Sequence, residues 1–272
     1  MSIKNTDIFG RKVFFIAPDS SLVPMSFMED FCTLGYESHI LSRGDGAMMA
    51  NIDVITSHFP DAVLFIDIDA NVPGVIWLQF IRHIQERNPD LVVGVVFSAS
   101  HHERIQHVES EYGKAVNSLA GCVALVPGES GENFKNLVAA LEKIGAKGRR
   151  NNIRARCNES SYISFGLGGK MFHARVDDVN ISHISCVLGE EGVHGMKIYD
   201  KARGAHICVN GLEFSSDVVL IMKREKGEIS NAVFMFIKKP DDEPGIESEH
   251  EASLNKKIYE ITSKEFTDLL KK

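Results

Sequence analysis

The chain has 272 residues, of which 44% are hydrophobic and 25% are charged, so its composition is that of a folded globular protein rather than a disordered segment. Its net charge is −7 and no apolar run reaches the roughly 18 residues of a membrane span, so we expect no membrane span and no DNA or RNA partner. Five scattered cysteines without a CxxC pair, and an N-terminus without a signal-peptide core, predict a cytoplasmic protein with reduced thiols and no metal site.

Short apolar runs alternate with amphipathic stretches through the first half of the chain. The runs are typical of strands buried on both faces, and the stretches place apolar side chains on one face of a helix. Strands are expected at 13–17, 38–41, 62–68, 91–97 and 122–126, and the clearest helices at 25–34, 75–85 and 134–144. This alternation predicts a parallel sheet with right-handed crossovers, in a flavodoxin-like, doubly wound α/β domain.

The glycines at 145 and 148 end the last of these helices, and the basic stretch 149–156 follows. We place the domain boundary here, which gives domains of residues 1–146 and 147–272. The second half consists of short β-rich segments separated by turn residues, at 162–165, 170–179, 185–187, 206–209, 217–223 and 232–237. This pattern predicts an all-β barrel. The acidic segment 241–251 is expected to form a mobile loop, and an apolar stripe at Phe266, Leu269 and Leu270 predicts a short C-terminal helix.

Polar residues follow two of the expected strands of the first domain. Asp69 comes after strand 62–68, Pro73 lies four residues later, and Ser98 comes after the next strand. In this spacing, residues 11–146 resemble a response-regulator receiver domain. The resemblance implies that Asp69 stands at the phosphoacceptor position, at the carboxyl edge of the sheet where such folds bind ligands.

Two parts of the receiver chemistry are missing from the first domain. Phosphoryl transfer needs clustered carboxylates to hold Mg²⁺ and a Lys to neutralise the phosphoryl group. Asp19 is the one acid after the first strand, and Val126-Pro127 stands where receivers carry Lys-Pro. We therefore predict a pseudo-receiver used for contacts. The alternative is a phosphorylation-driven response regulator, in which Asp69 is phosphorylated and Asp67 or Asp19 holds the metal.

A basic arm precedes the β-rich half. Arg150 and Arg154 form an Arg-x-x-x-Arg pattern, and Asn180-Ile-Ser182-His-Ile-Ser185 follows further along the chain. In these two motifs and their order, residues 149–239 resemble a PilZ domain, a family that binds cyclic di-GMP through RxxxR and [D/N]xSxxG. The resemblance implies a ligand site made of Arg149, Arg150, Arg154, Asn180, Ser182 and Ser185.

The chemistry of these residues suits a cyclic dinucleotide. Residues 149–239 carry a net charge of +4 between flanks of −7 and −4, which favours an anionic ligand. Arginine pairs with phosphate through a planar fork and also stacks on guanine or bonds its edge, whereas Asn180 and Ser182 suit the polar edge of the base. Ser185 replaces the motif glycine, which would strain the backbone by about 1 kcal/mol if φ were positive there.

No residue set points to catalysis or to a metal. His101, His102 and His107 lack suitably spaced Cys or acidic partners, and Cys157 lies beside Arg156, which would lower a thiol pKa, but has no catalytic base in sequence order. We therefore expect a cyclic di-GMP effector and not an enzyme, in which binding on the arm changes the arrangement of the domains and their contacts with an unknown protein partner. The family suggests control of motility. The alternative is an adaptor that binds no ligand and acts through protein–protein contacts.

Overall fold

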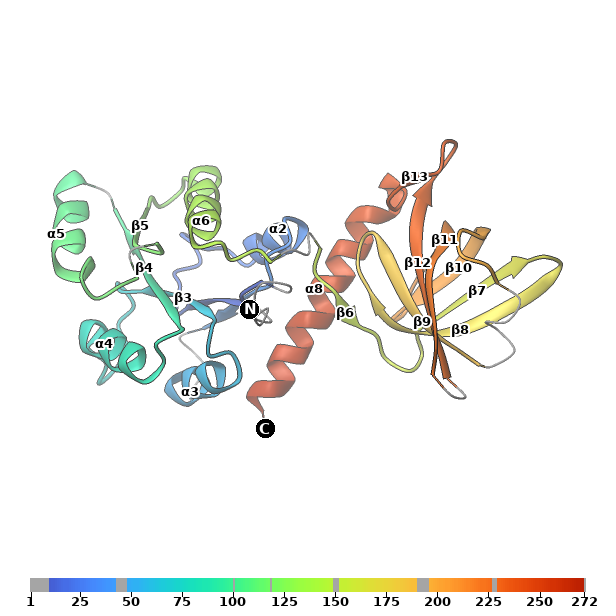
Figure 1. Cartoon of the computed structure of the whole chain (residues 1–272). Helices are drawn as coiled ribbons and strands as arrows, with labels where there is room; N and C mark the ends of the chain where they lie inside the picture. The colour runs from blue at the N-terminus through green and yellow to red at the C-terminus, as the bar shows by residue number, and fades with distance from the viewer. Residues whose placement is uncertain are drawn as a thin grey trace. The chain divides into compact units, whose positions relative to one another are not determined.

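The computed structural model describes residues 10–42, 48–99, 101–117, 119–148, 152–189, 196–226 and 229–271. The chain forms two compact units, shown in Figure 1, which are Met1–Asn151 with Phe266–Lys272, and Asn152–Glu265. The last seven residues thus group with the first unit. The boundary between residues 146 and 147, as a boundary between fragments that fold alone, stays a prediction.

The first unit is built on a parallel sheet with the strand order β2-β1-β3-β4-β5. Its strands are β1 (Val13–Ile16), β2 (Ser38–Leu41), β3 (Val63–Asp67), β4 (Val92–Ser98) and β5 (Cys122–Leu125). Its helices are α2 (Ser26–Thr33), α3 (Met48–His58), α4 (Trp77–Arg87), α5 (His102–Tyr112) and α6 (Ser130–Ile144). The flavodoxin-like fold expected from the alternation of patterns is confirmed.

Helices cover both faces of this sheet. On one face α2 and α6 lie together, and the rings of Phe31 and Phe134 are 4.9 Å apart. On the other face Ile52 of α3, Trp77 of α4 and Val108 of α5 belong to a single buried cluster. Burial on both faces explains why the strands read as continuous apolar runs.

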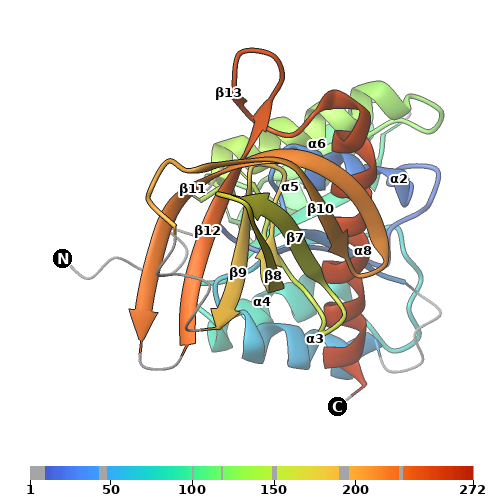
Figure 2. The same cartoon turned by 90° about the vertical axis from the view of Figure 1, so that its right-hand side faces the viewer.

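The second unit is an antiparallel barrel of six strands, which curl around a common axis in Figure 2. The strands are paired in the order β11-β10-β7-β8-β9-β12, and pairing of β12 with β11 closes the ring. Their bounds are β7 (Tyr162–Leu167), β8 (Lys170–Val179), β9 (His183–Gly189), β10 (Lys201–Val209), β11 (Leu212–Lys226) and β12 (Ile229–Lys238). Two short strands extend the sheet, β6 (Ala155–Arg156) on β8 and β13 (Glu243–Pro244) on β12. The predicted barrel is confirmed.

The C-terminal helix differs in length from the expectation. Helix α8 (Ser248–Leu270) has 23 residues, and the segment expected to be a mobile acidic loop contains β13 and the first turn of this helix. The reason is a run of buried side chains, Ile246, Leu254 and Ile258, that continues the apolar stripe toward the N-terminus of the helix. Within the described residues, no helix combines the length and apolarity that crossing a bilayer requires.

Candidate functional site

The arm and the strand motif of the second unit meet on the outer surface of the barrel. Asn152 of the arm donates an amide hydrogen bond to Ser182 Oγ over 3.1 Å, and the Arg154 guanidinium lies 3.4 Å from the Asp178 carboxylate. Two segments far apart in the sequence are therefore joined at two points. Arg149 and Arg150 lie outside the described residues.

Asn180 organises the entrance to β9. Its side-chain oxygen accepts hydrogen bonds from the Ser182 N–H (2.8 Å), the Ser182 hydroxyl (2.9 Å) and the His183 N–H (2.7 Å), and its own N–H donates to the His183 carbonyl (2.9 Å). The residue is 5% exposed. Because three donors already occupy the side-chain oxygen, the side-chain atom left for a ligand is the amide nitrogen.

Ser182 lies at the centre of this network. Its hydroxyl oxygen is 2.6 Å from His183 Nδ1 and 2.9 Å from the Asn180 side-chain oxygen, so the hydroxyl links the two side chains. Burial lowers the pKa of His183, and the nearby Arg154 cation lowers it further. The site is therefore a connected set of polar groups that starts from the arm.

Ser185 lies within regular β9, where it pairs with Asp178 of β8 and Val233 of β12. Among the described residues other than glycine, positive φ occurs at Ala17, Tyr199, Asn210 and Asp242, so Ser185 is not in the left-handed region. The strain considered for a serine at this position does not arise, because an ordinary strand conformation suits any side chain.

A bulge in β8 places Asp178 in the site. The pairing of β8 with β9 shifts register between Val176 and Asp178, so Asp177 is an extra residue on the β8 side. Asp177 is largely exposed and lies 3.7 Å from Arg175, whereas the Asp178 side chain is 24% exposed and faces Arg154. The two adjacent carboxylates thus have different partners, and it is Asp178 that pairs with an arginine of the arm.

In the first unit, protein groups surround the receiver-like aspartate. The Asp69 carboxylate accepts the Ser98 N–H over 2.8 Å and forms an ion pair with Arg104, whose Nε donates to the Ser98 carbonyl over 3.0 Å. The buried Asp67 carboxylate accepts the N–H groups of Asp19 (2.9 Å) and Asp69 (3.0 Å). Sequence reasoning missed Arg104, because only the parallel topology brings the start of α5 to the end of β3.

The remaining candidates do not form a reactive site. Within the described ranges, no three His, Cys, Asp or Glu side chains gather as metal ligands. Burial, helped by the charge of Asp178, raises the pKa of the Cys157 thiol to about 12. The suggestion that Arg156 would lower this pKa is therefore wrong, because loss of solvation outweighs a neighbouring cation.

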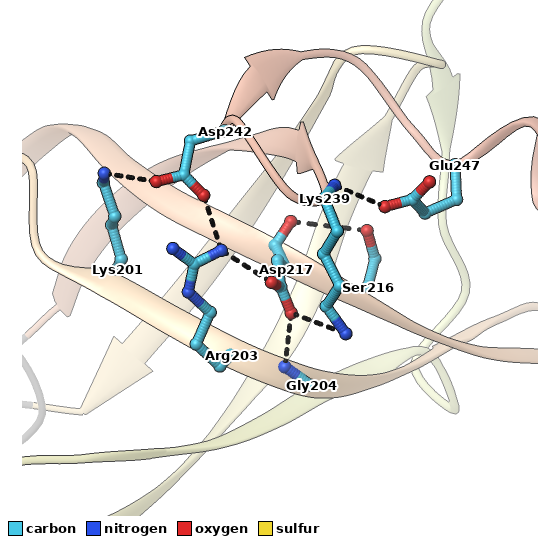
Figure 3. Close-up of polar contacts among 8 residues, drawn as sticks. All are labelled: Lys201, Arg203, Gly204, Ser216, Asp217, Lys239, Asp242 and Glu247. Carbon is cyan, nitrogen blue, oxygen red and sulfur yellow. Dashed lines mark hydrogen bonds and ion pairs between the residues drawn. The ribbon is translucent and has the colours of Figure 1, made fainter.

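A second polar cluster, which we call the charge cluster, joins β10, β11 and the segment after β12 (Figure 3). Its members are Lys201, Arg203, Asp217, Lys239 and Asp242. The buried Asp217 carboxylate accepts Arg203 Nη1 and the Gly204 N–H, each over 2.7 Å. Asp242 lies 2.5 Å from Arg203 and 2.6 Å from Lys201.

The charges of this cluster are paired, and their pKa values reflect the pairing. Burial opposes ionisation of Asp217, but the Arg203 guanidinium and the Gly204 N–H still hold its pKa below the ordinary value. Hydrogen bonds from Arg203 and then Lys201 lower the pKa of Asp242 to about 2. A cavity of about 420 Å³ adjoins the cluster, lined by Gly204, Ser215, Ser216, Asp217, Lys239, Glu247, Ser248 and Glu249. The cluster connects elements of the barrel wall, and no sequence motif predicts it because its members come from three separate segments of the chain.

No protein-family model and no curated protein matches the chain. Among solved structures, it is similar to the PilZ domain with c-di-GMP of YcgR from Escherichia coli, at 14% identity and a TM-score of 0.37, over 44% of this chain and 96% of that one. It is similar to the MrkH–c-di-GMP complex of K. pneumonia, at 11% identity and a TM-score of 0.33, over 45% of this chain and 55% of that one.

A third match is to a protein of a different kind. A response regulator receiver domain protein from Clostridium thermocellum matches at 13% identity and a TM-score of 0.34, over 50% of this chain and 94% of that one. Both kinds of domain expected from the sequence are thus among the matched structures. The chain spans only about half of the MrkH chain.

Proposed function

We propose that this chain is a non-catalytic effector whose second unit binds cyclic di-GMP on the outer surface of the barrel. The arm and the start of β9 provide the site, with Arg149, Arg150, Arg154, Asn180, Ser182 and Ser185 as its residues. Because the arm joins the two units along the chain, its contacts with a ligand would alter their arrangement and their contacts with a protein partner. A ligand shifts such an equilibrium only by its differential affinity for the two arrangements.

One observation carries the proposal, which is the meeting of the arm with the strand motif. Asn152 donates a hydrogen bond to Ser182. Arg154 forms an ion pair with Asp178 of β8, which is paired with Ser185 of β9. Neither contact follows from sequence order, since the partners are 30 and 24 residues apart and only the fold of the barrel brings them together. These contacts support the proposal that the arm and the start of β9 act as one site on a single ligand.

The chemistry of the site fits a dianionic, guanine-containing ligand. Arg154 is about one-third exposed, so its guanidinium is accessible for bidentate pairing with phosphate. His183 and Ser185 are half-buried on the same outward-facing side of β9, in alternation with the buried Ile184 and Cys186. Asn180 contributes mainly by holding the turn that positions Ser182 and His183.

Calorimetric titration of the full chain with cyclic di-GMP tests the proposal. Arg150→Ala and Arg154→Ala should each weaken binding by about 1.5–3 kcal/mol, the usual contribution of hydrogen bonds to charged groups, which is roughly one to two decades in Kd. Arg154→Lys should restore only part of the loss, because the charge returns without the planar fork.

Arg175→Ala is the matched control, since Arg175 is also an exposed arginine of the barrel, but it pairs with Asp177 and belongs to neither motif. It should bind like the wild type. If the wild-type protein shows no saturable binding at high micromolar ligand, or if both arm variants bind like the wild type, the ligand proposal fails. The adaptor function would then be the better explanation of the barrel.

A further inference from the structure

The ion pair between Arg154 and Asp178 bears on how the proposed site would accept a ligand. We propose that Asp178 is an internal competitor for Arg154, which it must release before the arm can pair with a phosphate. This inference rests on the proposed function, because it concerns the affinity of the same site. It assigns a role to a residue that belongs to neither sequence motif.

The geometry supports competition rather than a purely structural pair. The Arg154 guanidinium lies 3.4 Å from the Asp178 carboxylate, and the two side chains are 34% and 24% exposed. A carboxylate, like a phosphate, offers a guanidinium a pair of anionic oxygen acceptors. Asp178 is therefore paired with the guanidinium that a phosphate of the ligand would need to bind.

The arm does not depend on Asp178 for its position. The Asn152 amide bonds to Ser182 Oγ over 3.1 Å, and Ala155 and Arg156 of β6 pair with Val179 and Asp178 through the backbone. Backbone pairing is unchanged when the Asp178 side chain loses its charge. Removal of the charge should thus release the guanidinium and leave the arm attached to the barrel.

Electrostatic repulsion is a second way in which Asp178 would weaken binding of the ligand. A ligand with two phosphates that approaches Arg154 also approaches the Asp178 carboxylate, and juxtaposed like charges oppose binding. Loss of this carboxylate removes both the competing pair and the repulsion. From the modest strength of a partly exposed ion pair, we expect binding to become about three- to tenfold tighter.

The test is calorimetric titration of the full chain with cyclic di-GMP for wild type, Asp178→Asn and Asp178→Glu. Asp178→Asn should bind about three- to tenfold more tightly, whereas Asp178→Glu keeps the charge and should stay close to the wild type. Asp177→Asn is the matched control, because its carboxylate is adjacent in sequence but faces Arg175. It should leave the Kd unchanged.

A salt series gives a second measurement. Salt weakens the internal pair as well as the ligand contact, so the Kd of the wild type should rise less steeply with salt than that of Asp178→Asn. If the wild type binds and Asp178→Asn binds equally or more weakly, the competition is refuted; weaker binding would show instead that Asp178 positions Arg154 for the ligand. If wild type and all variants fail to bind, the proposed function falls and this inference falls with it.

Discussion

The end of helix α8 should be an essential part of the core of the first unit. Phe266 is 9% exposed, and its ring lies 5.2 Å from that of Phe14 on β1 and 4.5 Å from that of His39 on β2. The side chain thus completes a cluster whose other members come from the first half of the chain. We predict that Phe266→Ala strongly destabilises this unit.

The burial of Phe266 determines how much stability the Phe266→Ala variant should lose. Nine-tenths of a phenyl side chain of roughly 150–250 Å² is removed from water, which at about 25 cal/mol per Å² is about 3–6 kcal/mol. Core substitutions of Phe by Ala cost about 3–5 kcal/mol, which is a large part of the stability of a typical domain. Phe266→Leu should lose much less, because it retains most of the apolar volume.

Denaturant unfolding followed by Trp77 fluorescence is the appropriate assay. Trp77 is the one tryptophan of the chain, it is buried in the first unit, and its Nε1 donates to the Ala70 carbonyl over 2.8 Å. Lys264→Ala, at an exposed position of the same helix, is the control and should leave the transition unchanged. A loss below about 1 kcal/mol for Phe266→Ala, against the usual range for core phenylalanines, would refute the assignment of the helix end to this core.

The titration of His39 gives an independent measure of the same contact. Burial lowers the pKa of His39 below 6.5, although Glu37 opposes the shift. The unfolded chain therefore takes up a proton near pH 6.5 that the folded chain does not, so this group reduces stability as the pH falls below 6.5 toward the folded pKa. In Phe266→Ala, water reaches the ring, and NMR titration should show a higher His39 pKa than in the wild type.

Two further predictions concern the receiver-like site and the domain boundary. With a small phosphodonor and Mg²⁺, we expect no stable phosphate adduct on Asp69, because Arg104 and the Ser98 N–H already occupy its carboxylate; an adduct in intact-mass spectra that Asp69→Asn abolishes would contradict this. A fragment of residues 146–265 should fold as a β-rich unit by circular dichroism and retain the ligand site. Insolubility of this fragment, alongside a stable full chain, would show that the two units depend on each other for folding.

Most of the fold could be predicted because buried strands and helix faces appear in the sequence as regular patterns of apolar residues. The run 38–41 matches β2 and the segment 170–179 matches β8, since each is bounded by turn residues that end the strand. The length of α8 was missed because acidic residues in its first turns resemble a solvated loop. Only the burial of Leu254 and Ile258 shows that this segment had an apolar side to pack.

The ligand site could be predicted only in part, because sequence motifs name residues but not their partners. Asp178 belongs to neither motif, and its position beside Arg154 depends on a bulge that no local sequence pattern predicts. Arg104 reaches Asp69 for a similar reason, as the ends of two neighbouring strands bring them together. Charge pairs across a fold are set by topology, so one sequence alone does not identify them.

The bonds of Asn180 determine which variants can test the function. Its side-chain oxygen holds three donors of the turn that opens β9, so Asn180→Ala would disturb the turn whether or not a ligand binds there. A loss of binding in that variant would not separate recognition from folding. Arg154 and Asp178 differ, because both are partly exposed and backbone pairing holds the arm independently of their charges. Opposite effects of Arg154→Ala and Asp178→Asn on the Kd would therefore be strong evidence for recognition at this site, since simple destabilisation would weaken binding in both.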